Sequence, residues 1–350
     1  MDVTLFIVYI VAIGYLGITM YLANLEQLNW HENRGGARSL LFVAPGLVAL
    51  LGLYSVLIAT SSSQLNKMNA TSPDAALIPE IGTSALVAII LLTVIVPILS
   101  VRLIVSRDLR ERVKTYFNGT YSPYSIVHTT AIVLALMFFT VNTISFLLEG
   151  GTQGMAENIE SNGVSSAMTI FQAILWVMAA FLGVGYAIRR ELPETLKRLG
   201  IRFPTSEDFV WSFLTVIGIF IALSIFGMIL TVFVSTDELT EQSRAAESVV
   251  NAFSTIPLAI LMATSAAVGE EIFFRGAMQP VFGLIPTSIF FAVIHTQVLL
   301  TPNIIGIFMV GLAFGWLRQR YSTTTAIFAH FLYNFLIVMI NILVTSSGAI

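Results

Sequence analysis

The sequence predicts an all-α, polytopic membrane protein, a bundle of about ten transmembrane helices. Of its 350 residues, 56% are hydrophobic and 11% are charged, whereas soluble domains average about 45 to 50% and about 25%. The mean hydropathy is +0.87, which one buried core of this size cannot absorb but many lipid-facing helices can. The apolar residues also form separate segments, most of them near the length of about 20 residues that spans a bilayer.

Ten apolar segments are the expected helices: residues 3–23, 39–59, 84–105, 125–148, 165–187, 210–234, 253–274, 284–300, 303–317 and 323–345. The first segment lacks the basic start and the cleavage site of a signal peptide, so we expect it to be retained. The eighth and ninth segments are short and interrupted by Pro286 and Pro302, which favours tilted or broken helices. Gly311 and Gly315 form a small-residue pair of the kind that packs membrane helices together.

The positions of the basic residues predict the orientation of the helices. Fifteen of the 17 Lys and Arg residues lie in the loops after the first, third, fifth, seventh and ninth segments, and only Lys67 and Arg244 lie elsewhere. Cytoplasmic loops retain Lys and Arg. We therefore expect a multi-pass protein of the cell membrane with both termini outside.

One of these basic loops predicts a short helix at the membrane interface, near residues 192–199. Leu192, Leu196 and Leu199 fall on one helical face, with Pro193 near the start and Gly200 just past the end, as helix termini prefer. An ordinary charged connector with a membrane-facing side is the alternative.

Composition also excludes several classes of function. The chain has no cysteine, which excludes disulfides, thiolate metal sites and cysteine catalysis. The net charge is −3 and no basic tract occurs, so a nucleic-acid partner is not expected.

Six polar residues inside or at the ends of apolar segments are the functional candidates. They are Glu270, Glu271 and Arg275 in the seventh segment, His295 in the eighth, and His330 and Asn334 in the tenth. An ionisable group at membrane depth costs about 2.5 to 3.5 kcal/mol and indicates function by default. With a rise of 1.5 Å per residue, the first Glu, the two His and the Asn lie about 7 to 16 Å from the cytoplasmic helix ends, within one layer.

Spacing within the helices suggests a division of roles. Glu271 and Arg275 are four residues apart and can pair, which leaves Glu270 free. His330 and Asn334 are also four residues apart and project into one space. We expect Glu270 and His295 to activate a water, while His330 and Asn334 donate to an oxyanion. The predicted chemistry is hydrolysis of an amide or ester within the membrane.

Other interpretations stay open. A structural role is favoured over a catalytic one for the pair of Glu271 and Arg275. The other polar residues can form hydrogen bonds between helices without taking part in catalysis. Glu270, His295 and His330 are also ligand types of a hydrolytic zinc site, although no His-Glu-x-x-His motif occurs. We predict no metal and no cofactor. A proton-coupled transporter and a non-catalytic binding or immunity protein are the alternative functions.

The motifs Glu-Glu-x-x-x-Arg from Glu270, Phe-x-x-x-His ending at His295 and His-x-x-x-Asn from His330 resemble those of the CPBP family. This family comprises the CAAX-processing and bacteriocin-processing membrane proteases, also called Abi proteins, and includes the type II CAAX prenyl endopeptidases. The resemblance implies an intramembrane glutamic endopeptidase with Glu270 and His295 activating water, His330 and Asn334 forming the oxyanion hole, and Glu271 and Arg275 in support. Its substrate would be a protein or peptide, prenylated or membrane-embedded.

The resemblance also implies a division of the chain. Residues 188–350 would form the catalytic membrane region, together with the interfacial helix. Residues 1–187 would form a five-helix membrane region to which no motif assigns a role.

Overall fold

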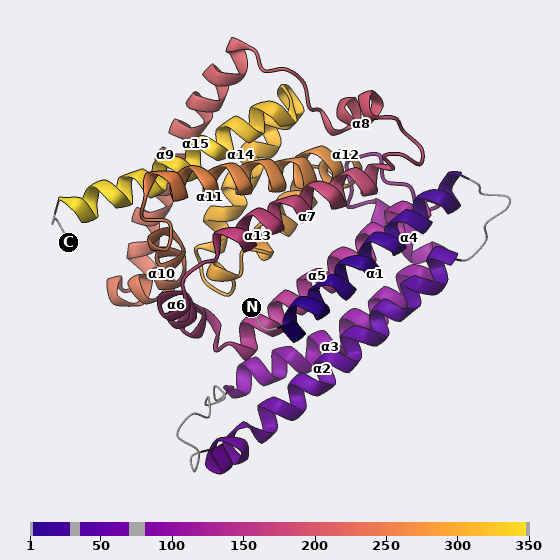
Figure 1. Cartoon of the computed structure of the whole chain (residues 1–350), viewed down its shortest axis with the longest axis horizontal. Helices are drawn as coiled ribbons and strands as arrows, with labels where there is room; N and C mark the ends of the chain where they lie inside the picture. The colour runs from indigo at the N-terminus through magenta and orange to yellow at the C-terminus, as the bar shows by residue number, and fades with distance from the viewer. Residues whose placement is uncertain (1–2, 29–35, 70–80, 348–350) are drawn as a thin grey trace. The chain divides into compact units, whose positions relative to one another are not determined.

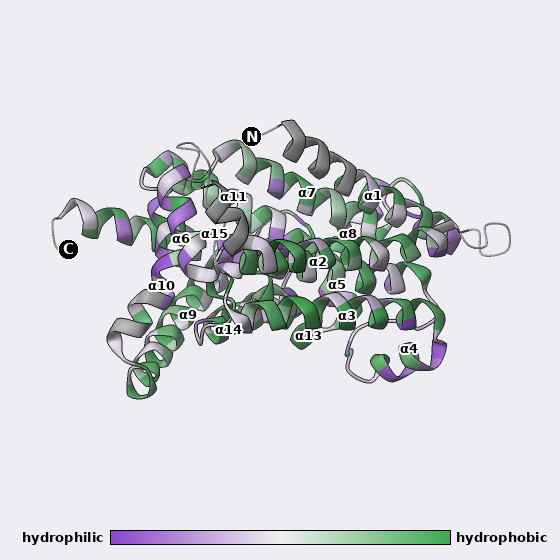
Figure 2. Ribbon diagram, turned by 90° about the horizontal axis from the view of Figure 1, so that it is seen from below, coloured by the Kyte–Doolittle hydropathy of each residue, from purple (hydrophilic) through white to green (hydrophobic). Residues whose placement is uncertain are grey.

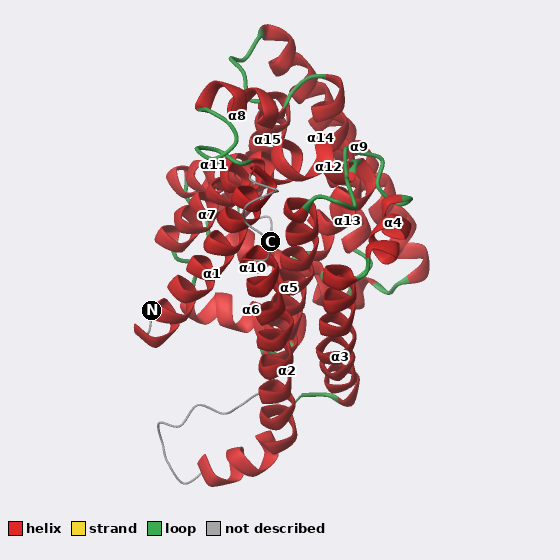
Figure 3. Ribbon diagram, turned by 90° about the vertical axis from the view of Figure 1, so that its right-hand side faces the viewer, coloured by secondary structure: helices red, strands yellow, loops and turns green. Residues whose placement is uncertain are grey.

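The computed structural model describes residues 3–28, 36–69 and 81–347, and these residues are helical without a β-strand (Figure 3). The chain forms two compact units. One comprises residues 1–114 and 122–155, and the other comprises residues 115–121 and 156–350. Because the described residues are helical, the predicted all-α class is confirmed. The predicted division into residues 1–187, without an assigned role, and a catalytic region of residues 188–350 stays a prediction.

The first unit packs four long helices and one short helix around an apolar core (Figure 1). The helices are α1 (Val3–Leu28), α2 (Gly36–Asn69), α3 (Thr83–Val105), α4 (Arg107–Lys114) and α5 (Ile126–Leu148). The long helices α2, α3 and α5 contact one another, and α1 contacts α2 and α5. Ser125 caps α5 by accepting a hydrogen bond from the backbone of His128, which satisfies an amide that the first turn leaves free.

The second unit contains all six candidate residues. Its elements are α6 (Gly151–Asn162, which starts in the first unit), α7 (Ser166–Val184), α8 (Leu192–Leu199), α9 (Ser206–Phe233), α10 (Thr236–Asn251), α11 (Ile256–Glu271), the π-helix η1 (Ile272–Met278), α12 (Gln279–Phe282), α13 (Leu284–Val293), the 3₁₀-helix η2 (Thr296–Val298), α14 (Ile304–Arg320) and α15 (Thr323–Ser346). Helix α11 packs against α7 and α15, and α14 packs against α13, α9 and α15.

Seven helices in the described part of the chain are long and apolar enough to span a membrane, so this is a multi-pass membrane protein. They are Gly36–Ser61, Thr83–Val105, Ile126–Leu148, Ser166–Val184, Ser206–Phe233, Ile256–Phe282 and Thr323–Ser346. Figure 2 shows hydrophobic residues along these long helices and hydrophilic residues gathered on α4, α6 and α10. The expected number of about ten is not confirmed.

The predicted eighth and ninth spans differ most from the structure. The helix expected over residues 284–300 ends at Val293, and His295 follows it as the residue before a 3₁₀ turn. The backbone then bends through Leu300, which has a positive φ of 66°, ahead of Pro302. Helix α14 has 17 residues, so it is also shorter than a full span. The third unconfirmed span, residues 3–23, lies within α1.

The short helix predicted near residues 192–199 is present as α8, with Pro193 in its first turn. Gly200 ends α8 with a φ of +70°, a conformation that favours glycine. A Cβ on Gly200 would also lie 2.5 Å from Cζ of Arg318. Because the end of the Arg318 side chain can shift, it is the backbone conformation that favours glycine at this position. The location of α8 at the membrane interface stays a prediction.

A polar cluster fixes the start of α15 and therefore the placement of His330 further along that helix. Asp208, at the start of α9, is fully buried and accepts two hydrogen bonds from Arg202, at 2.7 and 2.8 Å. It also accepts one from the hydroxyl of Thr325 at 2.5 Å. The hydroxyl of Thr323 donates to the carbonyl of Leu199 at 2.5 Å. These bonds tie α8, α9 and α15 together.

Candidate active site

The candidate site begins where α11 changes into a π-helix. Glu270 and Glu271 are the last residues of α11, and the π-helical residues follow directly. Short π-helical segments inside α-helices are rare overall. Those that do occur often lie at functional sites. Gly269 allows α11 to lie close to α7 here, because a Cβ at this position would lie 2.9 Å from Cα of Ala173.

Glu271, Arg275 and His330 form one buried cluster. Nη1 of Arg275 donates to Oε1 of Glu271 at 3.0 Å, and Nδ1 of His330 lies 2.8 Å from the same oxygen. The side chains are 0%, 1% and 5% exposed, respectively. The other oxygen of Glu271 is buried and has no hydrogen-bond partner among the described residues. The predicted pairing of Glu271 with Arg275 is confirmed, whereas sequence reasoning missed the contact with His330.

Arg275 also joins the π-helix to α14. Its Nη2 donates to the carbonyl of Gly311 at 3.1 Å, and its guanidinium lies 4.2 Å from the ring centre of Phe291. One turn further along, Nε2 of Gln279 donates to the carbonyl of Gly315 at 2.8 Å. The predicted small-residue pair packs closely, since a Cβ at Gly315 would lie 2.3 Å from Cδ1 of Leu284, and its two carbonyls also act as acceptors. Gln279 was missed because its apolar surroundings in sequence mark no partner for it.

Glu270 and His295 form a second close pair. Oε2 of Glu270 lies 3.9 Å from Nε2 of His295, and both side chains are slightly exposed, at 17% and 18%. Nδ1 of His295 lies 2.6 Å from the carbonyl oxygen of Phe291. Because a carbonyl only accepts, Nδ1 carries the proton and Nε2 is the acceptor of the neutral ring. Oε2 of Glu270 is buried and has no hydrogen-bond partner among the described residues.

Phe291 connects the two halves of the site. Its ring centre lies 4.6 Å from that of His295 and 6.1 Å from that of His330. Phe314 of α14 stacks on His330 at 4.9 Å between ring centres. These rings fill the space around both imidazoles and restrict the orientations that the imidazoles can adopt.

Asn334 follows His330 by one turn of α15 and is half-buried. No hydrogen bond or ion pair among the described residues joins Asn334 to the other five candidates. The structure therefore brings Glu270 close to His295, and Glu271 close to Arg275 and His330. Asn334 lies on the same helix as His330 but is not bonded to the other candidates.

The alternative metal set is divided between these two groups. His330 directs Nδ1 to Glu271, whereas Glu270 and His295 face each other. Within the described ranges, no three His, Cys, Asp or Glu side chains are grouped so that they could hold a metal ion. A metal-free reaction stays a prediction, because this geometry does not test it.

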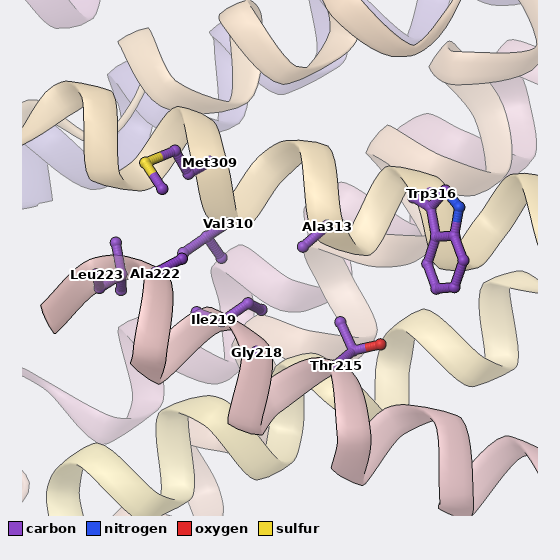
Figure 4. A pocket seen from close by; sticks show the side chains of 9 residues that line it. All are labelled: Thr215, Gly218, Ile219, Ala222, Leu223, Met309, Val310, Ala313 and Trp316. Atoms are coloured by element: carbon purple, nitrogen blue, oxygen red, sulfur yellow. The ribbon is translucent and has the colours of Figure 1, made fainter. Parts of the chain in front are cut away.

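A separate apolar groove lies between α9 and α14 (Figure 4). It has a volume of about 290 Å³ and is lined by residues such as Ile219, Leu223, Val310 and Trp316, with one hydroxyl from Thr215. No ionisable residue lines it. The groove contains none of the six candidate residues.

Residues 252–336 match the family described as type II CAAX prenyl endopeptidase, Rce1-like. The match covers roughly a quarter of the chain and includes all six candidate residues. It confirms the resemblance that the three motifs indicate, and that family implies a protease. No curated protein and no solved structure matches the chain significantly.

Proposed function

We propose that this protein is an intramembrane endopeptidase of the CPBP type, which hydrolyses a peptide bond with a water activated by Glu270 and His295. The observation that carries this proposal is the pair of facing acceptors, Oε2 of Glu270 and Nε2 of His295, 3.9 Å apart. Two acceptors at this separation repel each other unless a donor lies between them, and a water molecule has two hydrogens to donate.

The distance suits one bridging water. A water oxygen can lie about 2.8 Å from both acceptors, which is an ordinary hydrogen-bond length. The angle at this oxygen between the two acceptors is then roughly 90°. Such a water donates one hydrogen to the carboxylate and one to the imidazole, and its lone pairs remain available for attack on a carbonyl carbon. As the new bond forms, either acceptor can take the proton, which is general-base catalysis.

The same proposal gives His330 and Asn334 the role of stabilising the oxyanion. Nδ1 of His330 lies against Glu271, and an ionised carboxylate only accepts, so this nitrogen carries a proton. Nε2 can then donate to an oxyanion only when the ring carries both protons. The amide of Asn334 offers a second donor from the next turn of α15.

The substrate is a protein or peptide that reaches the cytoplasmic half of the membrane. The name of the matched family mentions a prenyl group. The apolar groove between α9 and α14 contains none of the six candidate residues, so the groove does not itself support a prenylated substrate. We propose a cell-membrane location with both termini outside, on the distribution of Lys and Arg. We propose further that the reaction needs no metal.

The direct test is peptide cleavage by the purified full chain in vesicles, with prenylated and unprenylated peptides as substrates. Glu270→Gln is nearly isosteric but a poor proton acceptor, so cleavage should fall by about 10² to 10⁴, the contribution of general-base catalysis. Arg320→Gln is the matched control, since Arg320 is exposed at the end of α14. Undiminished cleavage by folded Glu270→Gln protein would refute the mechanism, and proton-coupled uptake without cleavage would favour a transporter.

A further inference from the structure

A second polar feature of the same unit is a cavity lined mainly by basic side chains. It has a volume of about 750 Å³ and lies among the loop after α7, the helices α8 and α12, and the end of α14. Its lining includes five cations and one carboxylate: Arg189, Arg190, Lys197, Arg198 and Arg318, with Glu194. None of these residues belongs to the candidate active site.

Backbone contacts hold three of these arginines in place. Nη1 of Arg198 donates to the carbonyl of Gly276 at 3.0 Å, and Nε of Arg318 donates to the carbonyl of Arg275 at 3.2 Å. Arg190 donates to the carbonyl of Val184. A guanidinium has five N–H donors, so each of these bonds leaves donors for a ligand. The cationic groups are therefore positioned in advance by the fold.

The cations repel one another in this arrangement. Burial, together with the charges of Arg190, Arg318 and Arg189, lowers the pKa of Arg198 to about 10. The only lining carboxylate, that of Glu194, accepts a hydrogen bond from the backbone N–H of Glu191 at the start of α8. Lys197 is exposed and makes no hydrogen bond or ion pair among the described residues. An anion in the cavity would relieve this repulsion.

We propose that this basic cavity binds a phosphate group. Arginine presents a planar fork of donors that matches phosphate geometry, and lysine adds a point charge. Phosphate is favoured over a single carboxylate because five cations surround the cavity. Two apolar side chains of the same region, Leu192 and Phe203, are 47% and 93% exposed. Exposed apolar residues beside clustered cations are typical of surfaces that meet anionic lipid headgroups.

The test measures binding by the full chain and does not depend on proteolysis. Protein is purified from phosphatidylcholine vesicles that contain a minority of phosphatidylglycerol, and the retained phosphatidylglycerol is counted by native mass spectrometry. A parallel arm titrates inorganic phosphate onto protein in phosphatidylcholine alone and follows thermal stability. Lys197→Glu places a carboxylate among the arginines, and Arg320→Glu makes the same charge change at an exposed position outside the cavity lining.

We expect Lys197→Glu to weaken phosphate binding by at least roughly fivefold, the effect of one cation near an anionic surface. Arg320→Glu and Lys197→Arg should bind like the unaltered protein. Retention of phosphatidylglycerol supports a lipid source, and stabilisation by inorganic phosphate alone supports a free phosphate.

The proposal is overturned if neither phosphate source binds, or if Lys197→Glu and Arg320→Glu lose binding equally. If Lys197→Glu fails to fold in phosphatidylcholine, Lys197→Gln replaces it, with Arg320→Gln as its control and the same two outcomes.

Discussion

Replacing Arg275 tests whether its pairing with Glu271 supports the fold. Arg275→Met keeps much of the side-chain volume but leaves the carboxylate of Glu271 buried, with His330 as its remaining partner among the described residues. Breaking a buried ion pair from one side costs about 3 to 5 kcal/mol. We expect the lower end, about 3 kcal/mol, because His330 still lies 2.8 Å from Glu271.

The assay is thermal unfolding in one detergent, followed by intrinsic fluorescence. For a unit of about 200 residues, each kcal/mol shifts Tm by about 2 to 4 °C, so Arg275→Met should unfold about 6 to 12 °C lower. The matched control is Arg320→Met, at an exposed position, whose effect should stay within about 0.5 kcal/mol.

A second variant separates lost charge pairing from lost packing. Glu271→Gln combined with Arg275→Met removes both charges of the pair, so the double variant should be more stable than the sum of the single losses predicts. The reasoning is refuted if Arg275→Met unfolds at the temperature of the unaltered protein, or if the two single losses simply add.

Three further predictions concern the proposed reaction and the membrane topology. Asn334→Ala removes one donor to the oxyanion, so kcat should fall by about 10² to 10³ with Tm retained; unchanged kcat would exclude that role. Reporter fusions after Arg112 and after Ile350 should report opposite sides of the membrane, and matching reports would contradict the orientation. Cleavage by metal-stripped protein in excess chelator should continue, whereas loss that Zn²⁺ restores would indicate a zinc enzyme, with Glu270, His295 and His330 as the first residues to test.

The sequence predicts those features that depend on local spacing. The short helix α8 begins and ends where Pro193 and Gly200 indicate, and Glu271 pairs with Arg275 at a separation of four residues. These features depend on helix geometry and backbone preferences, which act within one or two turns. The apolar segments likewise predict the seven long helices, because burial in lipid acts on composition.

Features that depend on tertiary contacts could not be predicted in this way. The π-helix after Glu271 leaves no mark in the pattern of apolar residues. The eighth helix ends at Val293, seven residues before its expected end, because residues 294–300 contain no Gly or Pro that would mark the stop. Asp208 lies just before the segment expected over residues 210–234, yet it is fully buried because Arg202 and Thr325 satisfy its carboxylate.

The adjacent residues Glu270 and Glu271 show why sequence separates roles only in part. Consecutive residues of a helix point in different directions, so one carboxylate faces His295 and the other faces Arg275 and His330. Sequence spacing indicates that only one of them is free. The structure adds that the bound carboxylate contacts the histidine proposed to stabilise the oxyanion. Glu271 and Arg275 can therefore influence the reaction through the proton and orientation of His330, so substitutions at these two positions should affect cleavage even where the protein remains folded.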